Sequence, residues 1–190
     1  RPDATVVLET YSQPEPVAEG AAPGFGGGLP PWAPQCLAQF PRRATVQWVA
    51  DEITVPRHPV PWTARAPAGF AANVMRTHLA TWWRGRGEEV AVDWLAQLAQ
   101  LSLAHGYDGL SIFGEKSPFR TGSELNYLAL ADYGSAANPS ADLTSFLTRV
   151  AGPLLGGPER AQEFLRLARL IDSPAELEGA AAQARRQAAQ

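Results

Sequence analysis

The feature that most constrains the fold is an amphipathic helix that leads directly into a strand. Within residues 89–105, apolar side chains recur at the spacing of one helix face: Val90, Trp94, Leu98 and Leu101. Gly106 follows, and a glycine just past the last periodic residue commonly ends a helix. Residues 107–115 (YDGLSIFGE) then have the apolar and aromatic character of a strand. Because no hairpin turn separates the two elements, the strand is expected to pair in parallel with its neighbours.

Short apolar runs predict three further strands, over residues 4–10, 44–53 and 78–83. Residues 69–79, which precede the last of these strands, are expected to form a loop and a helix. The repeated order of strand, loop, helix and strand predicts an α/β fold with a parallel sheet.

Three helices without intervening strands are predicted after residue 122, over residues 124–133, 142–155 and 159–171. The chain has 190 residues, whereas a complete eight-stranded α/β barrel needs about 250. We therefore expect the C-terminal part of a (β/α)8 TIM-type barrel, formed by residues 1–140, followed by a helical segment, residues 141–190. An open parallel sheet leaves two edges and one face uncovered. A companion chain, a missing N-terminal barrel half or self-association is expected to cover them.

The charge distribution argues against nucleic acid as a partner. The net charge is −3, and the 16 Lys and Arg residues are scattered through the sequence and form no basic stripe. No apolar run approaches the roughly 18 to 20 residues of a membrane span, so no membrane partner is expected.

Cofactor motifs are also lacking in the sequence. The single cysteine and three histidines show no zinc-ligand spacing, so no metal is expected. Pro30 and Pro31 follow the glycine cluster at residues 24–28, where a phosphate-binding loop would need a helix start. Ser111 lies inside a predicted strand, and Phe113 stands where a nucleophile elbow needs its second glycine. The expected protein needs no cofactor and is not a serine hydrolase.

Acidic residues lie near the ends of three predicted strands. Alternation along each strand puts Glu115 on the face of Ser111, Asp51 on the face of Gln47, and Glu9 on the face of Val7. In a barrel these faces point into the lumen, and the strand ends form the active site. Glycoside hydrolysis needs two convergent carboxylates, one to protonate the leaving oxygen and one to attack or to activate water. We therefore predict these three acids as catalytic candidates, the alternative being that they cap helices or pair with nearby arginines.

A second group of residues is suited to binding sugars. Trp82 and Trp83 provide flat amphipathic surfaces, and Arg84 follows them with a cation that suits an acidic substituent. Glu52, beside Asp51, completes the predicted substrate-binding set. The alternative for the two tryptophans is that they fill the core.

Two segments resemble a known group of proteins. Residues 106–118 (GYDGLSIFGEKSP) and 124–130 (ELNYLAL) are similar to the last barrel strand and following helix of bacterial glycoside-hydrolase-like proteins, which are loosely related to β-hexosaminidases and α-glucuronidases. The likeness covers residues 82–172. It implies a TIM-type barrel with a carbohydrate-active site, in which Glu115 matches the acid at the strand end.

Three functions follow as hypotheses. The leading one is a glycoside-hydrolase-like barrel portion that acts on an oligosaccharide through its strand-end carboxylates. The second is a non-catalytic carbohydrate-binding or scaffold module that completes a partner's barrel. The third is a small α/β domain used for protein interaction.

Overall fold

The structure is a computed structural model that describes residues 5–10, 29–49, 65–78, 90–113, 121–135 and 138–172, and also residues 178, 179, 181 and 187. The chain divides into two compact units. The first comprises residues 1–78 and 96–113, and the second comprises residues 79–95 and 114–190. The domain boundary expected at residue 140 stays a prediction.

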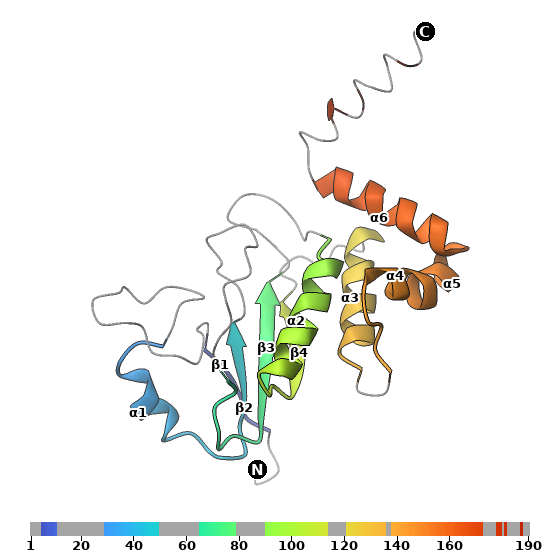
Figure 1. The fold of residues 1–190 in the computed structure, drawn as a ribbon. Coiled ribbons are helices and arrows are strands. Elements are labelled where there is room, and N and C mark those ends of the chain that lie inside the picture. Colours follow the sequence, from blue (N-terminus) through green and yellow to red (C-terminus); the bar gives the residue numbers. More distant parts are fainter. Residues whose placement is uncertain are drawn as a thin grey trace. The chain divides into compact units, whose positions relative to one another are not determined.

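The first unit is built on a parallel β-sheet of four strands in the order β1-β2-β3-β4 (Figure 1). The strands are β1 (Val7–Glu9), β2 (Thr45–Val49), β3 (Ala72–His78) and β4 (Gly109–Phe113). The short helix α1 (Ala33–Leu37) lies between β1 and β2 in the chain. The sheet confirms the α/β class and the parallel pairing predicted from the sequence.

The third strand lies elsewhere than predicted. Residues 69–79 were expected to form a loop and a helix, but Ala72–His78 is the strand β3, hydrogen-bonded between β2 and β4. The sequence of β3 lacks the alternation of polar and apolar residues that identifies a half-exposed strand, because polar residues fall on both of its faces, Asn73 and Thr77 on one and Arg76 on the other. Residues 79–83, which made up most of the predicted strand, lie outside the described part of the chain.

One face of the sheet is shielded from solvent. The residues on it with at most 5% of their surface exposed are Val46, Trp48, Asn73, Met75 and Thr77. The opposite face is less covered, since Val7 is exposed and Thr45, Gln47 and Val74 are half-buried. Val49 and Arg76 are buried on this second face. The sequence predicted Trp48 and Gln47 on opposite faces, and their burial agrees with that assignment.

Helix α2 (Val92–Ala104) confirms the amphipathic helix predicted within residues 89–105. Its apolar stripe is buried at Val92, Trp94, Leu95 and Leu98. Gly106 has a φ of +75°, a left-handed conformation that glycine adopts without steric cost. The Tyr107 N–H donates to the Ser102 carbonyl at 2.9 Å, which closes the helix end in the manner of a Schellman motif. The Ser102 hydroxyl contacts the Gly109 carbonyl at 3.4 Å, which ties this end of α2 to the start of β4.

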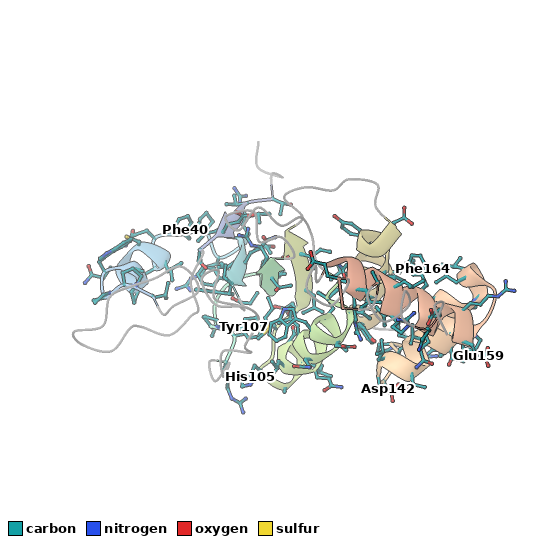
Figure 2. All side chains as sticks on the ribbon, turned by 90° about the horizontal axis from the view of Figure 1, so that it is seen from above. Phe40, His105, Tyr107, Asp142, Glu159 and Phe164 are labelled. Atoms are coloured by element: carbon teal, nitrogen blue, oxygen red, sulfur yellow. The ribbon has the colours of Figure 1, made fainter. Side chains whose placement is uncertain are left out.

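The second unit is helical. Its elements after residue 120 are α3 (Thr121–Tyr133), α4 (Leu143–Phe146), the π-helix η2 (Leu147–Ala151), α5 (Gly152–Leu155) and α6 (Pro158–Asp172). Asp142 and Glu159 lie at the beginnings of α4 and α6 (Figure 2). The rings of Tyr133 and Phe146 pack in its core with centroids 5.6 Å apart.

The single helix predicted over residues 142–155 is divided into three segments. Pro153 has no N–H to donate and its ring would clash with the carbonyl four residues earlier. The turn before it widens, so that the Gly152 N–H donates to the Leu147 carbonyl five residues back. Residues 143–155 therefore stay helical, but their hydrogen-bond pattern changes within the segment.

Candidate functional site

The carboxyl ends of the parallel strands are where this fold concentrates functional side chains. In parallel α/β sheets and barrels, ligands bind at this edge because the loops that leave the strands converge there. On the less covered face of the sheet, the polar side chains that the structure describes toward this edge include those of Glu9, Gln47, Arg76 and Ser111.

Glu9 and Arg76 form an ion pair across the sheet. Nη1 of Arg76 lies 2.6 Å from Oε1 of Glu9. Glu9 ends β1 and is in register with Gln47 of β2, which is in register with Val74 of β3. Arg76 lies two residues beyond Val74, so the contact crosses β2 diagonally toward the carboxyl edge.

The two partners differ strongly in exposure. The side chain of Arg76 is 2% exposed, and that of Glu9 is 41% exposed. A buried guanidinium is tolerated only when a carboxylate and further hydrogen bonds compensate for its lost hydration. The pair therefore anchors a surface carboxylate to a cation inside the sheet.

Ser111 lies beside Arg76 in the next strand, because the two residues are register partners of β3 and β4. Its Oγ is shielded from solvent and has no hydrogen-bond partner among the described residues. The predicted position of Ser111 inside a strand, on the face of Glu9, is confirmed by this register.

The Glu9 carboxylate, held by Arg76 and open to solvent, is suited to binding. The exposed carboxylate oxygens of Glu9 can accept hydrogen bonds from hydroxyl groups. Glu9 is thus suited to hold a polyhydroxylated ligand or to stabilise positive charge.

Of the seven predicted site residues, Glu9 is the one that the structure describes. Asp51, Glu52, Trp82, Trp83, Arg84 and Glu115 lie outside the described residues, and their predicted roles stay predictions. Trp94, which the sequence assigned to the apolar stripe of its helix, is buried as expected.

Sequence reasoning missed Arg76. The signal was a single charged residue within the run Asn73-Val74-Met75-Arg76-Thr77, where a buried strand would otherwise be apolar. The sequence predicts a loop and a helix over residues 69–79, and a helix accommodates an arginine on its exposed side.

The second unit contains a separate groove of about 710 Å³ between α4, η2 and α6. Leu147 and Leu165 contribute apolar surface to its lining, and Glu163 and Arg166 are among its charged residues. Arg166 donates two hydrogen bonds to Glu163, at 2.7 and 2.6 Å, and holds the pKa of that carboxyl below its usual range. These charges satisfy each other, and no predicted site residue lines the groove.

Within the described residues there is no cluster of three or more His, Cys, Asp or Glu side chains that could hold a metal ion. No helix in the described part of the chain is long and apolar enough to cross a membrane.

Comparisons of the chain with protein-family models, with curated proteins and with solved structures find no match. The class that the fold defines is therefore an α/β protein with a four-stranded parallel sheet.

Proposed function

We propose that this chain supplies part of a carbohydrate-active, glycoside-hydrolase-like site at the carboxyl ends of its strands. The observation that carries the proposal is the Glu9 carboxylate, which lies at the end of β1 and is held by Arg76 while 41% of its side chain stays exposed. In sequence, Asp51 follows Val49 by two residues, and Glu115 follows Phe113 by two residues. Side chains two residues apart lie on the same face of a strand. We therefore propose that all three acids lie on the face of the sheet that carries Glu9.

The strand order supports a barrel over a doubly wound sheet. Parallel strands joined by right-handed crossovers in the sequential order β1-β2-β3-β4 carry all of their connections on one face. A doubly wound sheet needs a reversal of strand order, which places helices on both faces. The sheet is therefore proposed as a segment of a TIM-type barrel, whose inner face carries Glu9 and Arg76.

The proposed roles divide among the acids. Glu115 is the acid/base candidate, Asp51 is the second carboxylate, and Glu9 binds sugar hydroxyls or stabilises developing positive charge. Trp82 and Trp83 are proposed to stack on sugar rings, with Arg84 and Glu52 as polar contacts.

The test is a glycoside hydrolysis assay on the assembled protein with a panel of aryl glycosides. Glu115→Gln and Asp51→Asn should each lower turnover by about 10²- to 10⁴-fold, since they remove proton transfer but keep the side-chain shape. Glu9→Gln should lower turnover by a smaller factor than these two substitutions. The matched control is Glu163→Gln on the exposed surface of α6, which should leave turnover unchanged. Absence of turnover on every glycoside tested, or equal rates for Glu115→Gln and the unaltered protein, would refute the catalytic role.

A non-catalytic carbohydrate-binding or scaffold module is the second candidate, because an acid already paired with a buried arginine can serve binding alone. This function predicts saturable oligosaccharide binding without turnover. Either function leaves the two edges and the inner face of the sheet to be covered by a companion chain, by further strands or by self-association. Sedimentation of the purified chain measures self-association directly.

A further inference from the structure

We infer that Arg76 is a positioning residue that fixes the carboxylate of Glu9 for contact with a ligand. This inference rests on the proposed function and adds to it a residue that neither the sequence motifs nor the predicted site contains. Arg76 acts through Glu9 and has only 2% of its side chain exposed, so it is not itself proposed to touch the ligand.

The difference in burial determines which partner anchors the other. A glutamate at a surface position has several rotamers of similar energy, and a salt bridge between two exposed side chains restrains them little. Here one partner is enclosed in the sheet, so its guanidinium has a fixed position. The 2.6 Å contact between Nη1 and Oε1 transmits that position to Glu9.

The strands that carry the two residues also differ. β3 has seven residues and is hydrogen-bonded on both sides, by β2 and by β4. β1 has three residues and pairs with β2. An anchor on the longer, doubly bonded strand is less mobile than the residue it holds, which is the arrangement that preorganised sites require.

The neighbours of Arg76 restrict its own side chain. Its register partners are Val49 on β2, which is fully buried, and Ser111 on β4. A packed side chain on one flank and a small one on the other leave the guanidinium a defined path toward Glu9. The contact with Glu9 is an ion pair, and a lysine at this position would keep the charge but lose the planar guanidinium.

Glu9 stays exposed although Arg76 holds it. Oε1 contacts Arg76, yet 41% of the side chain remains accessible. The carboxylate is thus held without being enclosed, which lets it meet a hydroxyl group of a ligand in one orientation.

The experiment compares Arg76→Met, which removes the charge, with Arg76→Lys, which keeps the charge and loses the planar fork. The control is Arg166→Lys, which makes the same change in the exposed pair with Glu163. Crystal structures of the unaltered protein and of each variant give the position of the Glu9 carboxylate, and steady-state kinetics on the best aryl glycoside give kcat and KM.

In Arg76→Met the Glu9 carboxylate should lose its single position, and kcat should fall by up to about 10-fold, no more than in Glu9→Gln, with a smaller change in KM, because misplacement mainly weakens transition-state contacts. Arg76→Lys should restore part of this loss, and Arg166→Lys should change neither quantity. If Arg76→Met does not fold, Arg76→Lys provides the same comparison on a smaller scale.

An unchanged Glu9 carboxylate in the Arg76 variants would overturn the inference, whatever the kinetics. If no glycoside is turned over, the proposed function fails separately. The crystal structures then still decide whether Arg76 positions Glu9.

Discussion

The indole N–H of Trp48, on β2, donates a 3.0 Å hydrogen bond to Oδ1 of Asn73, on β3. Both side chains are buried, so this contact satisfies the one polar atom of the tryptophan inside the sheet core. Nδ2 of Asn73 donates to the Pro67 carbonyl at 3.0 Å. Its backbone exchanges two 2.8 Å hydrogen bonds with Asp108, one to Oδ2 and one from the Asp108 N–H to the Asn73 carbonyl. A single asparagine thus connects two strands, a loop and the turn before β4.

Asn73→Leu should therefore destabilise the protein although it makes the core more apolar. The change leaves the Trp48 N–H and the Pro67 carbonyl without their observed partner, and each unsatisfied buried group costs about 1 to 3 kcal/mol. Urea unfolding measures the loss. If the cost comes from the indole, the double variant Asn73→Leu with Trp48→Phe should lose less than the sum of the two single variants. Additive losses would contradict this account.

The beginning of α2 depends on Asn126 of α3. Oδ1 of Asn126 accepts a 2.7 Å hydrogen bond from the backbone N–H of Ala91, and both residues are buried. The first N–H groups of a helix have no partner within it, so this side chain satisfies one of them from another helix.

Asn126→Ala should lower the free energy of unfolding by about 1 to 3 kcal/mol and speed hydrogen exchange at the Ala91 amide. Asn126→Asp keeps the acceptor oxygen and should retain most of the protection. The control is Asn138→Ala at an exposed position, which should change neither measurement. Unaltered exchange at Ala91 in Asn126→Ala would show that this hydrogen bond does not stabilise the helix.

Tyr133 should make the protein sensitive to alkali. Burial first, and then the negative charges of Asp132, Asp93 and Asp142, raise its pKa well above the ordinary value of 10.0. The folded protein therefore keeps the phenol proton at a pH where the unfolded chain has lost it. Stability is unaffected below pH 10 and falls as the pH rises above it. Unfolding curves measured from pH 8 to pH 11 should show this loss.

Tyr133→Phe should remove that loss. Oη of Tyr133 has no hydrogen-bond partner among the described residues, so the substitution also deletes an unsatisfied buried group and should be neutral or stabilising at pH 7 by up to about 1 kcal/mol. A variant that is clearly less stable at pH 7 would show that the hydroxyl has a partner in solution.

Gly152 offers a test in which two physical effects have opposite signs. Replacing a glycine within a helix by alanine usually stabilises it by about 1 kcal/mol. A Cβ at Gly152, however, would lie 2.7 Å from the Leu147 carbonyl oxygen and 3.2 Å from the nitrogen of Pro158. Both atoms belong to the backbone, so we expect Gly152→Ala to destabilise the protein by about 1 to 3 kcal/mol in thermal unfolding. A stabilised variant would mean that the turn between α5 and α6 moves freely.

Local patterns in the sequence determined the elements whose signals are complete within a few residues. The apolar stripe of α2 and Gly106 at its end predicted that helix, and the run that follows it predicted β4. Glu9 at the end of β1, on the same face as Gln47, followed from simple alternation, and the register confirms it. In each case the backbone conformation and the side of burial can be decided from neighbouring residues alone.

Tertiary structure determined the features that depend on residues far apart in the sequence. β3 carries polar residues on both of its faces, so its sequence shows no alternation, and its strand state comes from hydrogen bonds to β2 and β4. Arg76 is tolerated inside the sheet because Glu9, from a strand far away in the sequence, lies 2.6 Å from it. No local pattern encodes such a pair, since the free energy that keeps a charge buried arises only once the chain has brought its counter-charge across the sheet.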